Sequence, residues 1–367
     1  MRRPLSPPLK RLDRYVLRQF FQLFFIMVAA VILLFIIVNF FERLDKFVDR
    51  KAPFWAIVRF YWFQIPYLYV LFSPVGALLA AFFSVGEMAR RYEVLAVKTA
   101  GVSVYRFLAP LVGAGVLLSL VAFGVNDTLV PEAQHRVREI KTYEMHLESP
   151  RAIRRPKDMA FLGEGGILYY FGKMVRDTLA IQASFTQLDS LDRVVWRVDA
   201  NTALFTQGRW VLLHGTEFWF ENGRPRRVEV FQRRAYPEFT QTPAEFLKQR
   251  RRLDELNIRG LRRLIRTLSR AGFDTKREEV ELQIRFAFPL ANLIVLLFAL
   301  ALSVEMRGRG RAYGFGLAVF IAFFYWGLLQ ATRSMAGVGQ LNPVFSAWFP
   351  NLVFLAAALW AFRRVRT

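Results

Sequence analysis

Long uncharged runs alternate with short polar segments in the first third and the last quarter of the chain. The first run, FFQLFFIMVAAVILLFIIVNFF at residues 20–41, has 22 residues without a charge, and a bilayer core of about 30 Å needs about 20. Five further runs are long enough to cross and almost free of charge, at residues 60–85, 104–126, 285–304, 312–332 and 344–362. The pattern predicts six membrane-spanning helices, three on each side of a polar middle segment.

Basic residues precede the first run, as they precede the core of a cleaved signal peptide. Signal-peptide cores are about 7–15 residues long and are closed by small residues. The first run is longer and has no such cleavage pattern after it. We therefore expect it to be a spanning helix.

Short alternating runs replace the long ones between Met159 and Phe231, and turn-forming residues separate them. The runs are ILYYF, LAIQASF, RVVWRV, TALFTQ, RWVLLHG, TEFWFE and RRVEVF. Strands at this spacing are typical of a sandwich or jelly roll. The expected fold class is a membrane α-helical protein with an inserted all-β, jelly-roll-like domain. Its parts are residues 1–126 with spans one to three, 127–283 with the β-domain and trailing helices, and 284–367 with spans four to six.

Large apolar side chains on these strands have two interpretations. The simpler is that they form the core of the β-domain, and the alternative is that some line a groove for acyl chains. The residues concerned are Tyr169, Phe171, Phe185, Trp196, Trp210, Phe218 and Phe220.

Three helices are predicted after the strands. Thr242, Pro243 and Glu245 form a capping box that starts the first. The second runs from near Asn257 to Gly272, and the third opens at Asp274 and continues into the fourth span. The second, RGLRRLIRTLSRAG, is basic and amphipathic. It either lies along the membrane or the next helix, or its charged face is simply solvated.

The net charge of +22 raises the question of nucleic-acid binding, and the distribution of the charge answers it. Residues 127–283 hold 28 Lys and Arg against 22 Asp and Glu, whereas the rest of the chain holds 23 against 7. The excess flanks the spans, which indicates membrane topology. Because Lys and Arg are retained on the cytoplasmic face, we expect both termini and the loop after the second span to be cytoplasmic and residues 127–283 to lie outside.

Residues for catalysis or ion coupling are scarce. The chain has no cysteine, and its histidines, His135, His146 and His214, have no metal-ligand spacing. GEGG at residues 163–166 lacks the lysine and hydroxyl residue of a phosphate-binding loop. The strong polar groups inside the spans are Asn39, Gln64, Asn292, Gln330 and Asn351. Because none is charged, we expect no proton coupling, and energy for transport must come from another chain.

Prolines interrupt four of the six predicted spans. Each removes a backbone donor and bends its helix, either as a packing kink or to leave room for a cavity or hinge. They are Pro66, Pro74, Pro110, Pro289 and Pro350.

The segment SVGEMARRYEVLAVKTAGVS, residues 84–103, lies between the second and third spans. It predicts a short helix, too polar to insert, that ends at Gly101. Its role is either that of a handle for a cytoplasmic partner or that of a solvated loop.

Three stretches resemble the lipopolysaccharide export permease family of the LptF/LptG (YjgP/YjgQ) type. They are LDRYVLRQF, GEMARRYEVLAVKTAGVSVYRFLAPL, and RGLRRLIRTLSRAGFDTKREEVELQIRFAFPLANLIVLLFALALS. The start LDRY and the second stretch are closer to the LptG type. The resemblance implies a permease subunit of an ABC-type exporter in the bacterial inner membrane. It would pair with a second LptF/LptG-type permease and pass lipopolysaccharide to a periplasmic bridge of the LptC/LptA type.

The resemblance also implies that the chain itself holds no cofactor and no catalytic residue, because ATP is bound and hydrolysed by a cytoplasmic ATPase dimer of the LptB type. In the family's coupling helix, here about residues 85–101, a glutamate follows an arginine-rich turn and precedes an alanine and a terminal glycine. Glu93 is the expected central contact with the ATPase. The whole set is Glu87, Arg90, Arg91, Glu93, Ala96, Lys98 and Gly101.

Lipid A carries phosphates, so basic residues at the outer ends of spans one and three are the candidates for binding it. They are Arg43, Lys46, Arg50, Lys51, Arg136, Arg138 and Lys141. Some members of the family have a lysine deeper in span one, where this chain has Asn39.

Two other classes of function are compatible with parts of the pattern. A membrane-anchored periplasmic lipid-binding or scaffold protein would use the β-domain and need the spans only as a tether, but six spans exceed that need. A secondary transporter would need charges inside the spans.

Overall fold

The computed structural model describes residues 7–146, 157–162, 167–176, 178–189, 193–221, 224–236, 239, 242, 253–270, 273–304 and 310–364. The chain divides into two compact units. The helical unit consists of residues 1–49, 57–137 and 276–367, and the second unit of residues 50–56 and 138–275.

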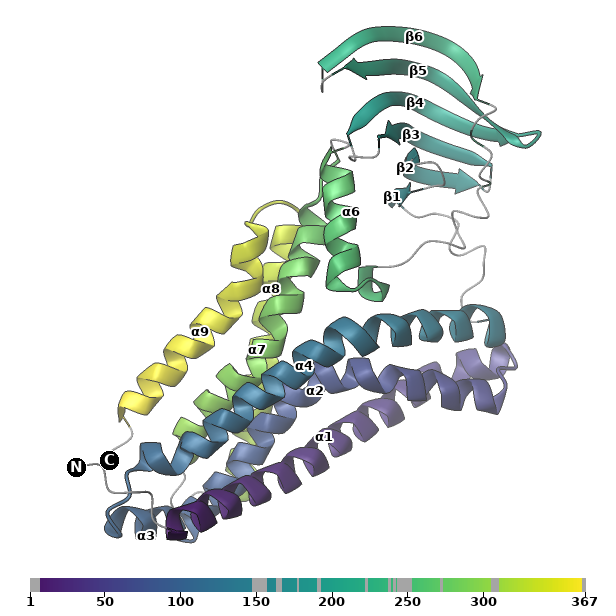
Figure 1. Ribbon diagram of the computed structural model, residues 1–367. Coiled ribbons are helices and arrows are strands. Elements are labelled where there is room, and N and C mark those ends of the chain that lie inside the picture. The colour runs from purple at the N-terminus through teal and green to yellow at the C-terminus, as the bar shows by residue number, and fades with distance from the viewer. Residues whose placement is uncertain are drawn as a thin grey trace. The chain divides into compact units, whose positions relative to one another are not determined.

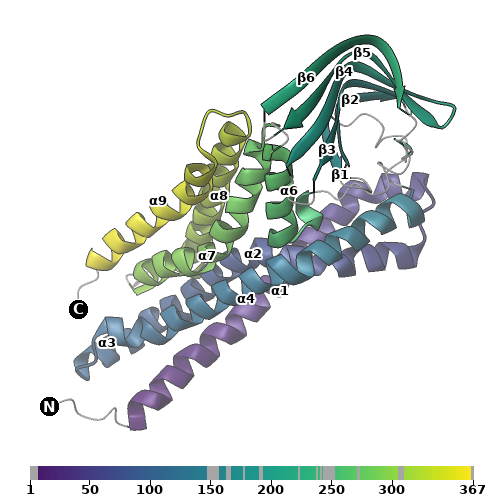
Figure 2. The same ribbon diagram turned by 45° about the horizontal axis from the view of Figure 1, so that its top comes forward.

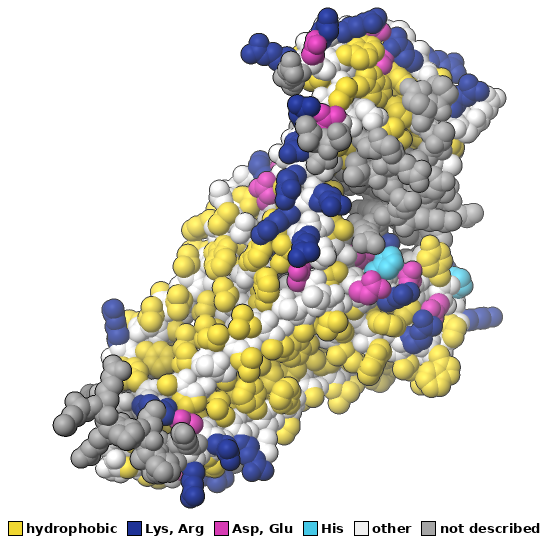
Figure 3. All heavy atoms as spheres, viewed as in Figure 1, with side chains coloured by type: hydrophobic (Ala, Val, Ile, Leu, Met, Phe, Trp, Pro, Cys, Tyr) yellow, Lys and Arg dark blue, Asp and Glu magenta, His cyan; other side chains and the backbone are white. Residues whose placement is uncertain are grey.

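The helical unit contains six helices long and apolar enough to cross a membrane, as the sequence predicts (Figure 1). Figure 3 shows hydrophobic side chains covering most of its visible surface, with Lys and Arg gathered toward the ends. Before the sheet come α1 (Pro7–Asp49), α2 (Phe54–Arg90), the short α3 (Glu93–Thr99) and α4 (Val104–Glu139), which continues as the π-helical turn η1 (Ile140–Glu144). After it come α7 (Lys276–Val304), α8 (Arg311–Gly337) and α9 (Pro343–Arg364).

One stripe of α1 joins the core of the helical unit. Val16, Phe20, Phe24 and Val28 recur every fourth residue, so they lie on one face of the helix, and all four are buried. Gly76 of α2 lies opposite Val28, and a Cβ atom built there would be 2.2 Å from Val28 Cγ2. A side chain larger than hydrogen would force the two helices apart.

Two of the predicted proline kinks have identifiable partners for the carbonyl that each proline leaves unbonded. Pro350 frees the carbonyl of Ser346, and the Thr332 hydroxyl of α8 donates to it at 2.8 Å. Pro74 frees the carbonyl of Val70, which accepts from the Ser73 hydroxyl at 3.3 Å. At these two positions the carbonyl that the proline leaves unbonded is therefore satisfied by a hydroxyl group.

The second unit is built on an antiparallel sheet in which the strands follow one another in chain order. The strands are β1 (Lys157–Leu162), β2 (Ile167–Arg176), β3 (Leu179–Leu188), β4 (Val194–Thr206), β5 (Arg209–Glu221) and β6 (Arg224–Tyr236). RVVWRV and TALFTQ are parts of one strand, as are RWVLLHG and TEFWFE. The all-β prediction is confirmed, but the described strands form one sheet, not the two of a sandwich.

The sheet is bent along a line that crosses five strands. Figure 2 shows its longer strands arching over one concave face. Side chains that face inward normally recur every second residue of a strand. Here, in each of the five strands, two successive inward-facing residues are three positions apart, and these residues pair across the strands in two rows. The first row is Phe171, Ala183, Ala200, Gly215 and Phe231, and the second is Met174, Ala180, Ala203, Leu212 and Arg234.

Two residues per strand therefore turn outward between the rows. Gln182 and His214 lie on this line with φ values of 56° and 50°, a left-handed conformation that non-glycine residues rarely adopt. A Cβ on Gly215 would be 2.4 Å from the ring of Phe231. Small residues at the bend allow one sheet to enclose a core on its own concave face.

That core is aromatic, as the simpler interpretation of the strands predicts. Tyr169, Phe171, Phe185 and Trp210 are each at most 1% exposed, and Trp196 packs against them half-buried. The prediction is wrong for Phe218 and Phe220. Phe218 follows the inward-facing Glu217, so it points to the opposite face, where it contacts Phe220.

The basic helix predicted after the strands is α6 (Ile258–Arg270), preceded by the 3₁₀ turn η4 (Leu253–Glu255). Asn257 caps it, because its Oδ1 accepts from the Gly260 amide at 2.8 Å. Leu268 of α6 and Leu168 of β2 pack together. The apolar face of α6 thus covers the sheet, which corrects the prediction that this face rests on the membrane or the next helix. The predicted helix at Thr242–Glu245 falls largely outside the described residues.

Candidate functional site

The segment predicted as a single helix over residues 85–101 is two helices joined by a sharp turn. Residues 85–90 are the last turns of α2, and α3 begins at Glu93. Tyr92, between them, has φ 63°, so the α-helical ladder is interrupted there. The sequence gives no warning of this, because Tyr92 is neither glycine nor asparagine.

The end of the segment is as predicted. Gly101 has φ 79°, its amide donates to the Lys98 carbonyl at 2.9 Å, and the Val102 amide donates to the Val97 carbonyl at 3.1 Å. These two bonds are the Schellman arrangement, which ends a helix with glycine in the left-handed conformation. The chain therefore reverses immediately and enters α4.

Three of the predicted coupling residues interact with one another. Glu87 receives hydrogen bonds from Arg90 at 2.8 Å and from Arg91 at 2.9 Å, and its side chain is 11% exposed. A carboxylate held between two guanidinium groups stabilises the last turn of α2. Glu87 is thus part of the base of the turn that carries α3.

The short helix α3 has a buried face and an exposed face. Val94 is 5% exposed and belongs to the core of the helical unit, and Val97 packs against that core. Tyr92 is 62% exposed and Leu95 38%, and Ala96 is also exposed. The outward face is therefore largely apolar. The sequence prediction concentrated on charged residues and did not include Tyr92 and Leu95. Apolar residues on both faces of a seven-residue helix would have indicated that one of the faces is exposed.

Contacts from α3 and the start of α4 reach the first span. The Tyr15 hydroxyl of α1 donates to Glu93 Oε2 at 3.2 Å. Arg106 of α4 forms two hydrogen bonds with Asp13 of α1, at 3.0 and 2.7 Å. Paired guanidinium–carboxylate bonds of this kind fix orientation as well as distance. We call Asp13, Tyr15, Glu93 and Arg106 the α1 clamp.

The last span is also connected to this end of the bundle. The Tyr105 hydroxyl of α4 donates to the Phe362 carbonyl of α9 at 3.2 Å.

Glu93, the expected central contact with the ATPase, is half-buried and already accepts a hydrogen bond from Tyr15. Lys98 is half-buried as well.

The candidates for phosphate binding lie on separate elements. Arg43 and Lys46 are on the last turns of α1, Arg50 and Lys51 are in the turn before α2, and Arg136, Arg138 and Lys141 are on α4 and η1. Arg43 lies over the ring of Phe60, 5.9 Å from its centroid. Arg138 pairs at 3.2 Å with Glu255, whose side chain is 1% exposed, and Arg136 pairs at 3.4 Å with Glu132.

Asn39 is a contact between helices. It is 9% exposed, and its Oδ1 accepts from the Tyr61 hydroxyl of α2 at 3.3 Å. Arg285, at the start of the fourth predicted span, is buried. The sequence pattern does not single it out, because it stands at the boundary of the apolar run.

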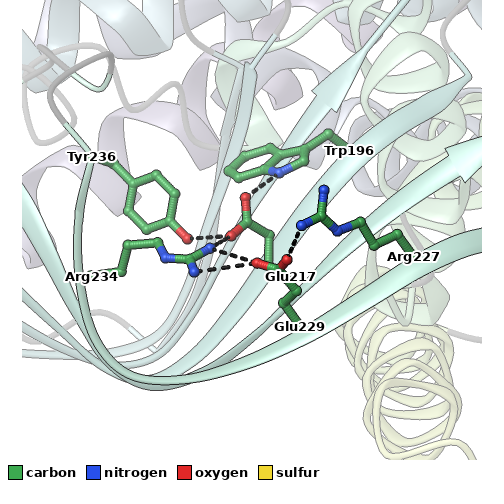
Figure 4. Close-up of polar contacts among 6 residues, drawn as sticks. All are labelled: Trp196, Glu217, Arg227, Glu229, Arg234 and Tyr236. Atoms are coloured by element: carbon green, nitrogen blue, oxygen red, sulfur yellow. Dashed lines mark hydrogen bonds and ion pairs between the residues drawn. The ribbon is translucent and has the colours of Figure 1, made fainter.

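A partly buried polar cluster on the concave face of the sheet was not predicted (Figure 4). Glu217 of β5 is 5% exposed and accepts from Trp196 Nε1 at 2.7 Å and from the Tyr236 hydroxyl at 3.1 Å. Arg234 pairs with both Glu217 and Glu229. These side chains come from the neighbouring strands β4, β5 and β6. Only the pairing of the strands shows that they meet, so the sequence alone does not reveal the cluster.

The cluster has a defined charge state. Burial, and next the Glu217 carboxylate, raise the pKa of the Tyr236 phenol, which therefore remains a donor. The hydrogen bond from Arg227 lowers the pKa of Glu229. Among the described residues there is no group of three or more His, Asp or Glu arranged for a metal.

Comparison with known proteins identifies the family of the chain. The family model "Lipopolysaccharide export system permease LptF/LptG" matches residues 14–364, that is, both units and all six spans. The chain belongs to the LptF/LptG family.

Individual members of that family are distant relatives. The chain is 20% identical to a protein of Haemophilus influenzae named "Lipopolysaccharide export system permease protein LptG", over 97% of this chain and 99% of that protein. It is also 20% identical to the protein of the same name from Escherichia coli K12, again over 97% of this chain and 99% of that protein. Membership in the family makes the chain a multi-pass membrane protein of lipopolysaccharide export.

Proposed function

We propose that this chain is the membrane-embedded permease subunit of an ATP-driven lipopolysaccharide exporter. It extracts lipopolysaccharide from the bacterial inner membrane and passes it to a periplasmic bridge. A separate cytoplasmic ATPase dimer binds and hydrolyses ATP, and a second LptF/LptG-type permease completes the pathway. In this arrangement both termini and α3 are cytoplasmic and the sheet is periplasmic. Lipopolysaccharide is proposed as the substrate because the two relatives are named as lipopolysaccharide export permeases.

The observation that carries the ATPase coupling is the two-faced helix α3. Val94 seats it in the core of the helical unit, while Tyr92 and Leu95 face outward. An exposed apolar face of this kind fits a hydrophobic recess of a partner. The α1 clamp then links whatever holds α3 to the first span.

Substrate binding is the less specified part of the proposal. Arg43, Lys46, Arg50 and Lys51 carry positive charge at the outer end of α1 and the turn after it, where phosphates of lipid A would pass. Arg138 is a weaker candidate than the others, because Glu255 already neutralises it.

The test is co-purification of the ATPase subunit and of lipopolysaccharide with the tagged chain from native membranes. Leu95→Asp places a charge on the exposed face of α3, and Glu93→Lys reverses the predicted central charge. We expect Leu95→Asp to reduce recovery of the ATPase at least about tenfold, because a desolvated charge at an interface costs several kcal/mol. We expect Glu93→Lys to reduce it too.

Ala312→Asp is the matched control, because Ala312 is likewise exposed, near the first turn of α8, and the change adds the same charge. If Leu95→Asp retained the ATPase as fully as Ala312→Asp does, α3 would not be the coupling site. If deletion of the ATPase left the cellular role of the chain intact, the membrane-anchored scaffold would replace the exporter.

A further inference from the structure

The arginine side chains of α6 form a stripe on the outer side of the second unit. Arg259, Arg262, Arg263, Arg266 and Arg270 are all exposed. At 3.6 residues per turn these five positions fall within about 100° of the helix circumference. Figure 3 shows Lys and Arg side chains gathered over α6. We call these residues the α6 stripe.

The opposite side of α6 is already occupied. Leu261 and Leu268 are buried, and Leu268 packs on Leu168 of the sheet with Leu264 and Phe273 beside it. The helix therefore cannot insert an apolar face into a bilayer, as interfacial amphipathic helices do. Any interaction of its outer side is electrostatic.

Three of the five arginines have no ion pair with a carboxylate among the described residues, namely Arg259, Arg263 and Arg266, whereas Arg262 and Arg270 have partners within the chain. Like charges three or four residues apart on a helix repel one another. An external partner with dense negative charge relieves that repulsion, and guanidinium groups match phosphate geometry.

The chain itself restricts where that partner lies. Arg270 is followed after five residues by Lys276, the first residue of the spanning helix α7. Six backbone steps reach at most about 21 Å. The stripe is thus tethered to a helix that enters the bilayer a few turns later.

We propose that the α6 stripe binds the phosphate headgroups of anionic phospholipids at the surface of the membrane that α7 enters. The proposal needs only the membrane location of the chain and does not depend on lipopolysaccharide export. It assigns α6 a double function, because one face closes the sheet while the other holds the second unit on the membrane surface.

The experiment uses the full chain in nanodiscs. Because the chain has no cysteine, Ser269→Cys gives a single labelling site, exposed and beside the stripe. A fluorophore there is quenched by a small fraction of phosphatidylcholine spin-labelled on its headgroup. The phosphatidylglycerol content of the nanodiscs is varied, and the content that gives half-maximal quenching is measured.

We expect phosphatidylglycerol to increase quenching and added salt to reverse the increase, because exposed charges are screened. In the Ser269→Cys background, Arg263→Gln with Arg266→Gln should raise the half-maximal phosphatidylglycerol content on the order of tenfold, from the contribution of each basic residue near an anionic surface. The matched control is Arg224→Gln with Arg233→Gln, which removes the same charge from exposed positions of β6 and should change it little.

Three results would overturn the proposal. Quenching independent of phosphatidylglycerol and salt would show that the stripe is only solvated. An equal change in the β6 control would show that net charge, not the stripe, is responsible. A third arm adds lipopolysaccharide to phosphatidylcholine nanodiscs: quenching by lipopolysaccharide and none by phosphatidylglycerol would identify the stripe as a cargo contact and replace the proposed membrane contact.

Discussion

The first span and the last three spans are held in place by different kinds of contact. In the apolar 18-residue window of α1, 11% of the residues are buried, against 67% in α7, 28% in α8 and 39% in α9. Apart from the Asn39–Tyr61 hydrogen bond and the Arg43–Phe60 contact, the contacts described above for α1 are apolar packing along one stripe and the α1 clamp at its start. Most of its length therefore faces away from the rest of the chain.

Directional hydrogen bonds between helices join α7, α8 and α9. Asn351 of α9 accepts from the Tyr325 hydroxyl of α8 at 2.8 Å and donates to the Ala287 carbonyl of α7 at 2.7 Å. Thr332 bonds to the freed Ser346 carbonyl, and Arg333 pairs with Glu281 at 2.6 Å. Moving any of the three helices alone would leave buried polar groups unsatisfied, which is costly in a bilayer.

The difference indicates which part of the bundle is free to move. Apolar packing is non-directional, so a shift of α1 along its stripe breaks fewer hydrogen bonds than a shift of α7, α8 or α9. Its first turns, by contrast, follow α3 and α4 through the α1 clamp. We infer that α7, α8 and α9 form a fixed frame and that α1 is the element which responds to movement of α3.

The strongest test of this comparison concerns Gly76 of α2, where a Cβ atom would lie 2.2 Å from Val28 Cγ2 of α1. Gly76→Ala places a methyl group against Val28, and overpacking of this kind costs about 1–3 kcal/mol. The loss should appear as a lower unfolding midpoint in detergent, followed by tryptophan fluorescence. Adding Val28→Ala should restore most of it.

Gly113→Ala in α4 is the control, because a Cβ there meets nothing within 4 Å. Equal midpoints for Gly76→Ala and Gly113→Ala would mean that α1 does not depend on this fit.

The second test separates the α1 clamp from simple stability. Asp13→Arg replaces attraction to Arg106 by repulsion, and lipopolysaccharide transport by the reconstituted exporter should fall on the order of tenfold, a usual size for energetic coupling between sites. Co-purification of the ATPase should not change, because the outward face of α3 is untouched. The exchanged pair, Asp13→Arg with Arg106→Asp, should recover transport. Failure of the exchange to recover it, with the protein folded, would remove the clamp from the coupling path.

The third test addresses the fixed frame. Asn351→Leu removes both hydrogen bonds of Asn351 and should lower the unfolding free energy by about 1 kcal/mol, since hydrogen bonds between membrane helices are individually modest. Gln330→Leu changes an exposed amide on α8 and should have less than about half that effect. If the two variants unfold alike, the frame is not held by its buried polar groups.

The smallest expected effect is an acid response confined to the sheet. The folded-state pKa of Glu229 is lowered, first by the hydrogen bond from Arg227. Its contribution to stability is therefore complete above the unfolded pKa and is lost as pH falls through the lower, folded value. The ion pairs lie at the surface, so the change should be slight. Hydrogen exchange of β6 should increase below about pH 4.5 while that of α7 to α9 stays constant, and Glu229→Gln should abolish the response.

The sequence predicts the helices well because length and uninterrupted apolarity are sufficient for a span. Gly101 predicts the end of α3 for an equally local reason, since the Schellman arrangement needs a residue that tolerates positive φ. Asn257 and the aromatic residues on alternate strand positions are further local signals that the structure confirms.

What the sequence does not reveal depends on pairs far apart in the chain or on strained backbone. Asp13 and Arg106 are 93 residues apart, and nothing local relates them. The turn at Tyr92 and the bend at Gln182 and His214 use left-handed conformations that tertiary packing imposes on ordinary residues. From the sequence, Glu217 looks like a solvated strand residue. It faces inward only because of the three-residue step in β5.

That step has an evolutionary consequence for the sheet. The inward–outward alternation of side chains shifts at the same line in five neighbouring strands. Deletion of a single residue from one strand would therefore move the side chains on one side of the line to the opposite face, while those of the neighbouring strands kept their orientation. The length of each strand across the line is thus tied to the length of every other. We expect tolerated insertions and deletions to collect in the hairpin loops and to leave the line itself unchanged.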